Sequence, residues 1–434
     1  MKRPVLITLL VLALLFVLTG IGAVVFFAIN SGFAINNPFD KRNIPSVLEE
    51  NKTLKVDSEQ LLTLKVNDAA GDVTVTGGDV QTVQVKAIKT AYDSSQSRAD
   101  AEVKGVKYTI EQTGNSIILK YELPKSINFS NKVNTVDFIV TVPNEVTVDI
   151  DTNGEVNVSD TKGNVVIDND FGKINVENIE GALLVKNNSG EVQATSIKAG
   201  SAGIDLHSDF GEINLAQASG ATVTLNSNSG GITLTNVRST GDLSTTTDFG
   251  DTKYENGSAN SLNVKTNSGK VALTKLNIGK ELKVDSDFGE IELNQASAGS
   301  YDLHTNSGSI NVDGAKNGLK AYTDFGGITI ENAQSVTVDL KTNSGTVEFS
   351  GSLGKGPHVI KSDFGGIDIT LPTDSKLNMD LKADFGGIRS DIPLTVTLDG
   401  SSDKNHQVGT MNGGGDQLTV TTNSGSISIK SMNK

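Results

Sequence analysis

The 434-residue sequence has no cysteine and no tryptophan, and it contains only 8 prolines and 4 histidines. Without cysteine the chain has no disulfide, zinc–thiolate site, thiol nucleophile or bacterial lipoprotein anchor. Its 45 glycines are a modest excess, and glycine and proline together stay below the content of disordered or collagen-like chains. The composition is therefore that of a folded protein without covalent cross-links.

Basic residues are also fewer than acidic residues. The chain has 37 basic and 51 acidic residues, which give a formal net charge of −14. Binding of nucleic acid requires a basic stripe or patch, and the sequence shows none. We therefore expect no nucleic-acid partner, and we interpret the acidic excess as a solvated surface.

One long apolar run, residues 5–29, follows Lys2 and Arg3 and contains no charged residue. About twenty such residues span a bilayer, and basic residues before the run favour a cytoplasmic N-terminus. We predict a signal anchor at residues 1–30, single-pass topology in the cell membrane and an extracellular C-terminal ectodomain. That ectodomain would carry 35 basic and 51 acidic residues, a net charge of −16. A cleaved signal peptide is the alternative, although the apolar part of a signal peptide is usually shorter.

Beyond this run, two short motifs alternate along the chain. Asp-Phe-Gly occurs seven times and ends at Gly172, Gly211, Gly250, Gly289, Gly326, Gly365 and Gly386. Asn-Ser-Gly ends at Gly190, Gly230, Gly269, Gly308, Gly345 and Gly425. From Gly154 to Gly386, successive motif glycines are 18 to 21 residues apart. A fixed period of this size predicts a stack of repeats rather than a globular domain with one compact core.

Apolar residues recur at fixed offsets from each motif glycine, with mostly polar residues between them. Ile or Val stands two residues after almost every motif glycine, and Thr252 is the exception in this column. Further apolar columns stand five and seven residues before the glycine, as at Leu206 and Ile204. Such alternation indicates strands with one buried face. Two short strands per repeat predict an all-β fold, a single-chain and right-handed β-solenoid of about 14 coils of 18–21 residues.

The motif residues are predicted to be structural corners of the coils. Glycine takes positive φ easily, and Asp or Asn can hydrogen-bond to backbone amides in a turn. We expect the Phe column to cap the core, and the Asn amides to donate to the Asp carboxylates of neighbouring coils. Only Asp363 and Asp384 are expected to lie in adjacent coils. The Asp column is Asp170, Asp209, Asp248, Asp287, Asp324, Asp363 and Asp384, and the Phe column is Phe171, Phe210, Phe249, Phe288, Phe325, Phe364 and Phe385.

The rest of the chain divides into four segments. Residues 31–52 are predicted to form a polar linker, and residues 53–150 a β-rich N-terminal cap with the first coils, including one helix at 94–104. Residues 151–389 are predicted to form the regular solenoid. The irregular segment 390–434 is predicted to be a C-terminal cap coil, because the ends of a stack must be protected from further strand pairing.

At this point the sequence resembles a known family. The recurrent Asn-Ser-Gly-x-Ile and Asp-Phe-Gly-x-Ile units are similar to the bacterial "putative adhesin" family of repetitive β-solenoid envelope proteins. Residues 384–391 and 422–427 carry the most specific part of this resemblance, which covers roughly residues 61–430. It implies an envelope-exposed solenoid, in some members tethered by one transmembrane helix. It implies no catalytic residues.

We predict no catalytic, cofactor or metal site. Asp-Phe-Gly also marks the metal-binding loop of protein kinases, but seven copies without the other kinase motifs exclude that interpretation. His207 and His304 share one offset in coils that would lie about 24 Å apart, too far to bind one metal ion.

The predicted function is that of a non-catalytic, membrane-anchored surface protein, acting as an adhesin-like binding or spacer module. Its expected partners are the membrane, through the N-terminal helix, and a cell-wall glycan or protein ligand. A polysaccharide-active β-helix lyase or hydrolase, and a self-associating envelope scaffold, are the alternatives.

Overall fold

The computed structural model describes residues 44–123, 132–396 and 404–432, which form two compact units. The first unit holds the described residues 44–48, 89–106 and 132–134, and the second holds residues 49–88, 107–123 and those from 135 onward. The predicted signal anchor at residues 1–30 lies outside the described residues. Within the described ranges, no helix is long and apolar enough to cross a membrane.

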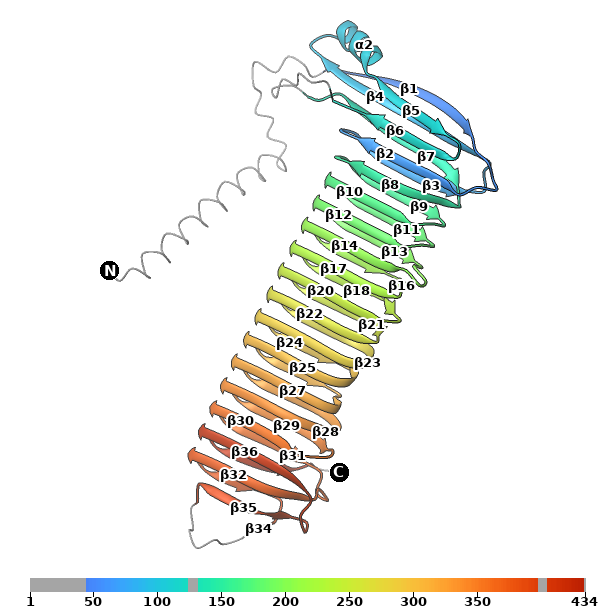
Figure 1. Ribbon diagram of the computed structural model, residues 1–434. Coiled ribbons are helices and arrows are strands. Elements are labelled where there is room, and N and C mark those ends of the chain that lie inside the picture. Colours follow the sequence, from blue (N-terminus) through green and yellow to red (C-terminus); the bar gives the residue numbers. More distant parts are fainter. Residues whose placement is uncertain (1–43, 124–131, 397–403, 433–434) are drawn as a thin grey trace, which may run out of the picture. The chain divides into compact units, whose positions relative to one another are not determined.

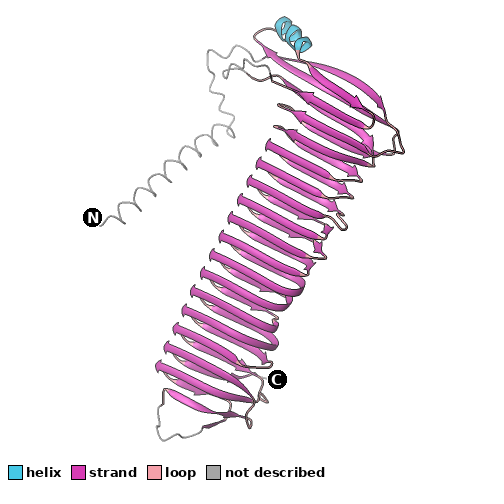
Figure 2. Ribbon diagram, viewed as in Figure 1, coloured by secondary structure: helices cyan, strands magenta, loops and turns pink. Residues whose placement is uncertain are grey.

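Strands make up nearly all of the second unit (Figure 2). Up to the first regular coils the elements are β1 (Ile44–Lys55), β2 (Leu62–Asp68), β3 (Val73–Gly78), β4 (Thr82–Asp93), α2 (Gln96–Gly105), β5 (Tyr108–Thr113), β6 (Ser116–Tyr121), β7 (Thr135–Pro143), β8 (Val146–Thr152) and β9 (Val156–Thr161). The regular part begins with β10 (Val165–Phe171), β11 (Ile174–Ile179), β12 (Leu183–Ser189), β13 (Val192–Ile197), β14 (Gly203–Phe210), β15 (Ile213–Ala216), β16 (Ser219–Gly220), β17 (Thr222–Ser229), β18 (Ile232–Thr235), β19 (Arg238–Ser239), β20 (Asp242–Phe249) and β21 (Thr252–Ala259).

The chain continues with longer strands, several of which bend round a corner of the coil. They are β22 (Ser261–Ser268), β23 (Val271–Phe288), β24 (Ile291–Asn294), β25 (Ser297–Ser307), β26 (Ile310–Asp313), β27 (Lys316–Phe325), β28 (Ile328–Ser344), β29 (Val347–Leu353), β30 (His358–Phe364) and β31 (Ile367–Leu371). The last strands are β32 (Leu377–Phe385), β33 (Ile388–Ser390), β34 (Leu394–Val396), β35 (His406–Met411), β36 (Asp416–Ser424) and β37 (Ile427–Ser431).

The regular coils stack in parallel and in register, so the predicted all-β solenoid is confirmed (Figure 1). One face, which we call the first face, contains the strand that precedes each motif glycine. The second face contains the strand that follows it. In the first face Ile204 pairs with Val223, and in the second Ile213 pairs with Ile232. Aligned repeats therefore place identical columns directly over one another.

The predicted apolar columns form the core between these faces. Leu206, Leu225 and Ile213 each have no exposed surface. Thr252, the exception in its column, is also buried, with its hydroxyl unpartnered. Alternating burial along each strand follows from the period of two in the sequence.

The coil count differs from the prediction of about 14. The chain makes about 11 turns in regular order, from β10 to β31. At both ends of the stack the layers are in a different order from the sequence, so a count of motif glycines overestimates the regular part.

At the N-terminal end, β2 lies between β8 and β6, and β3 lies between β9 and β7. Antiparallel β5 then pairs with β6. On the face that contains β2 and β6, the antiparallel strand ends the parallel stacking, as expected for a protected edge. Of the predicted linker, residues 44–52 instead belong to β1, and residues 31–43 lie outside the described residues. Strand β1 could not be predicted because most of its side chains are exposed and show no apolar alternation.

At the C-terminal end, the last strands of the chain are not the last layer of the stack. Strand β36 lies between β30 and β32, and β37 lies between β31 and β33. Antiparallel β35 pairs with the outer edge of β32, and β34 pairs with β35. Of the predicted cap coil, residues 390–434, β34 and β35 therefore lie at the outer edge of the stack, whereas β36 and β37 insert one layer inward.

Candidate functional site

The motif glycines stack so closely that no side chain fits at the corner. A Cβ placed on Gly308 would lie 2.0 Å from the carbonyl oxygen of Gly289 in the preceding layer. The same clash recurs along the column, for example between Gly345 and the Gly326 carbonyl at 2.0 Å. Glycine is required here by the approach of neighbouring backbones rather than by a ligand.

Buried hydroxyls line the inside of the same corner, three residues before the glycine. Thr323 donates to the Gly308 carbonyl at 3.0 Å, and Ser362 donates to the Gly345 carbonyl at 2.9 Å. These hydroxyls therefore satisfy backbone carbonyls of the preceding layer instead of forming a chain among themselves. Thr266 and Ser286 are buried in the column without a hydrogen-bond partner.

Outside the corner, asparagines and aspartates alternate as the sequence predicts. Asn306 donates to the Asp287 carboxylate at 2.8 Å, one layer away. The other donor–acceptor pairs, with N–O distances of 2.5 to 3.2 Å, are Asn188–Asp170, Asn228–Asp209, Asn267–Asp248, Asn343–Asp324 and Asn423–Asp363. Each carboxylate is thereby separated from the next by an amide layer.

The prediction that Asp363 and Asp384 occupy adjacent layers is wrong. Strand β36 inserts between their strands, so that Ser424 pairs with Phe364 on one side and with Phe385 on the other. Asn423 accordingly donates to Asp363 at 3.2 Å. The two motifs therefore alternate between neighbouring layers of the structure here, although they do not alternate along the sequence.

The Phe column does not cap the core, and that prediction is corrected. All seven side chains point to solvent, with exposed fractions of 63% for Phe171 to 80% for Phe385. The residue before the glycine stands where the strand ends and the chain turns, so the inward and outward alternation no longer applies. Together we call these seven residues the phenylalanine ladder. A serine occupies each layer between them: Ser189, Ser229, Ser268, Ser307, Ser344 and Ser424.

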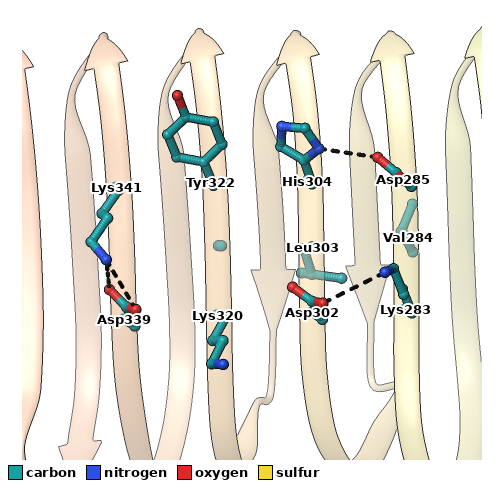
Figure 3. Close-up of a pocket in the computed structure, with 11 residues that line it drawn as sticks. Lys283, Val284, Asp285, Asp302, Leu303, His304, Lys320, Tyr322, Asp339 and Lys341 are labelled. Carbon is teal, nitrogen blue, oxygen red and sulfur yellow. Dashed lines mark hydrogen bonds and ion pairs between the residues drawn. The ribbon is translucent and has the colours of Figure 1, made fainter.

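A hollow of about 370 Å³ lies on the outer surface of the first face, across β23, β25, β27 and β28 (Figure 3). One row of its lining is His304 and Tyr322, whose rings stack with centroids 5.2 Å apart, beside Asp285. The parallel row alternates in charge: Lys283, Asp302, Lys320 and Asp339. The hollow therefore offers flat ring faces together with charged hydrogen-bonding groups.

The polar groups of the hollow are largely paired with one another. His304 Nδ1 lies 3.0 Å from Asp285, and Lys341 lies 2.8 Å from Asp339. The Tyr322 hydroxyl donates to Asp324, and this hydrogen bond raises the pKa of Tyr322. Sequence reasoning missed this hollow because it depends on which side chains become lateral neighbours in successive coils.

His207 and His304, which share one offset in the repeat, are not neighbours in the structure. They lie in β14 and β25, which are separated by β17, β20, β22 and the second half of β23. His207 contacts Asp209 at 3.2 Å and has Asn226 in place of an aromatic neighbour. Among the described residues, no cluster of three or more His, Asp or Glu side chains could hold a metal ion.

One buried carboxyl group stands out at the N-terminal end of the stack. Burial raises the pKa of Asp68 to about 7, and the nearby Asp137 and Asp72 carboxylates raise it further. Its Oδ1 accepts a hydrogen bond from the Ala70 amide at 3.1 Å, while its buried Oδ2 has no partner. Because burial favours the protonated form of this carboxyl in the folded state, we interpret Asp68 as a source of pH-dependent stability.

Stacked two-strand coils around an apolar core, with one repeating corner, define a β-solenoid repeat protein. The chain belongs to the Toastrack DUF4097 family, which it matches over residues 63–257 and 253–430. The predicted family resemblance is thereby confirmed.

Two solved structures are similar to this chain. One is a "putative cell adhesion protein" from Clostridium sporogenes, 11% identical, with 89% of this chain and 100% of that chain covered and a TM-score of 0.20. The other is a "putative adhesin" from Bacteroides fragilis, 10% identical, with 89% and 97% covered and a TM-score of 0.20. No curated protein matches the chain.

Proposed function

We propose that this protein is a non-catalytic, membrane-anchored surface protein of the bacterial envelope, whose solenoid binds other molecules in an adhesin-like manner. The observation that carries this proposal is the phenylalanine ladder. Its seven residues expose roughly 900 Å² if a fully exposed phenylalanine presents about 200 Å². The largest apolar patch on a typical monomer is about 300–600 Å², and larger ones mark interaction surfaces.

Anchoring by the N-terminal segment is the second part of the proposal. It rests on the charge-free run at residues 5–29 and the basic residues before it. A protease added to intact cells that lack an outer membrane should degrade the chain after about residue 31, while a cytoplasmic marker protein stays intact. A chain that remains protected would contradict the proposed topology.

Adhesion itself is tested with cells that display the full chain. They should be retained better than cells without it on a surface coated with purified peptidoglycan or with cells of the same kind. Retention equal to that of the control cells on every surface would contradict the binding function. New reducing ends or unsaturated products from a polysaccharide panel, abolished by one point substitution, would favour the enzymatic alternative.

A further inference from the structure

We propose that the phenylalanine ladder is an interface for a second copy of the same chain, docked antiparallel so that the phenylalanines of each copy occupy the serine layers of the other. The inference rests on the proposed binding function and names its partner. It is supported by the spacing of the ladder, by its symmetry and by the side chains beside it.

The spacing suits interdigitated rings. Strand layers repeat every 4.8 Å or so, so successive phenylalanines of the ladder lie about 9.6 Å apart with one serine layer between. A ring placed over that serine would lie about 4.8 Å along the stack from a phenylalanine on either side. Favourable aromatic pairs have centroids about 4.5–7 Å apart. Each serine layer is therefore a site where one more ring fits.

A second copy is the partner whose period matches over the whole ladder. Thirteen layers, from Phe171 to Phe385, alternate without interruption, because β36 inserts between β30 and β32. A partner with any other repeat would drift out of register along these layers. The exposed area of roughly 900 Å² also meets the approximately 800 Å² per partner of a standard protein interface.

Symmetry selects the antiparallel arrangement. A two-fold axis along the stack would bring each layer opposite itself, so that phenylalanine would meet phenylalanine and the serine layers would stay empty. A two-fold axis perpendicular to the stack reverses the order of the layers. When it passes midway between two central layers, six of the seven phenylalanines of one copy face the six serines of the other, and one terminal phenylalanine lies beyond the overlap, in an isologous contact.

The neighbouring polar column agrees with this arrangement. Asp287 precedes Phe288, and Asn306 precedes Ser307 in the next layer. A copy docked antiparallel therefore also brings Asp opposite Asn, an acceptor opposite an amide donor. The acidic excess opposes association at long range, and salt screens that repulsion. We therefore expect pairing to strengthen with salt, unlike the binding of a cationic partner.

The test uses the full chain in detergent, measured by sedimentation, and in two populations of differently labelled vesicles, measured by clustering. The first variant, F249S/F288S/F325S, removes three rings from the middle of the ladder. The second variant, S268F/S307F, fills two serine layers without removing any ring. The control, I139S/V408S, removes two apolar side chains that are 40% and 45% exposed and lie outside the ladder.

We expect the wild type and the control to dimerise and to cluster vesicles, and each ladder variant to lose affinity about tenfold or more. Mixing the two ladder variants should restore clustering, because the two added rings of one face two of the three vacated positions of the other. Unchanged far-UV spectra verify folding. A monomeric wild type, unaffected ladder variants or a mixture no better than its components would overturn the inference.

Failure here is distinguishable from failure of the proposed function. A monomeric chain whose ladder phenylalanines are needed for retention on peptidoglycan would overturn the second copy as partner and leave the binding function intact. A chain that neither dimerises nor is retained would contradict both proposals.

Discussion

Asp-Phe and Asn-Ser corners alternate from layer to layer both in the middle of the stack and at its C-terminal end, but the alternation arises differently in the two regions. In the middle, Asp-Phe and Asn-Ser corners alternate because they alternate in the sequence. At the end, two Asp-Phe corners follow one another in the sequence, and β36 inserts between them. The comparison indicates that alternation is a property of neighbouring layers in space, since β36 separates two carboxylates and two rings that follow one another in the sequence.

The N-terminal end of the stack differs from both the middle and the C-terminal end. There, the corner near Gly71 has the buried Asp68 in place of a hydroxyl, and β2 and β3 lie between strands distant in the sequence. Each end contains antiparallel pairs, β5 with β6 or β35 with β32, whereas the middle is wholly parallel. Reordered layers and antiparallel edges therefore distinguish the ends from the repeating part.

The largest effect should come from breaking the corner in the middle of the stack. Gly308→Ala places a Cβ against the Gly289 carbonyl, and we expect a loss of about 3 kcal/mol or more in unfolding free energy. Gly318→Ala is the matched control, since nothing lies within 4 Å of its Cβ. Urea denaturation followed by circular dichroism measures both. Equal midpoints for the two variants would show that the layers are not packed this closely.

The second-largest effect should be on the pH dependence of the unfolding free energy, through Asp68 at the N-terminal end of the stack. The pKa of Asp68 is raised from 3.8 to about 7, so the folded state holds this proton more tightly than the unfolded state. Its stabilising contribution is complete below about pH 4 and is lost as pH rises to about 7, on the order of 2–4 kcal/mol. Asp68→Asn should flatten this part of the profile and stabilise the protein at pH 8. A profile unchanged by the substitution would contradict the assignment.

A smaller loss of stability should follow when an Asn-Ser corner in the middle of the stack is replaced by Asp-Phe. The double substitution N306D/S307F removes the amide that donates to Asp287 and sets a third carboxylate between Asp287 and Asp324. We expect a loss of about 1–2 kcal/mol, partly relieved by salt. Because the ladder is exposed, S307F alone should change stability by less than about 0.5 kcal/mol. If the single and double variants unfold alike in urea, the carboxylates do not require separation.

The strands and the core could be predicted from the sequence because they depend on a local period of two. Ile213 and Leu206 are buried as their columns indicate, and the predicted helix is observed as α2. The right-handed winding stays a prediction. The exposure of Phe288 was mispredicted because apolar character alone does not reveal that alternation stops at a corner.

Pairings between distant segments could not be predicted. An irregular segment separates Gly386 from Gly425, and nothing in its local pattern specifies the layer with which β36 pairs. The hollow beside Tyr322 depends in the same way on lateral neighbours that come from separate coils. In each case the missing information was the order of the layers.

That order can be measured directly, because the chain contains no cysteine of its own. A disulfide requires Cα atoms about 4.4–6.8 Å apart, a condition met by aligned residues in adjacent layers and not by residues two layers apart. Under oxidising conditions F364C/S424C and S424C/F385C should therefore cross-link as readily as F325C/S344C in the middle, and F364C/F385C should not. Efficient cross-linking of F364C/F385C, with none to Ser424→Cys, would contradict the inserted layer and the alternation that depends on it.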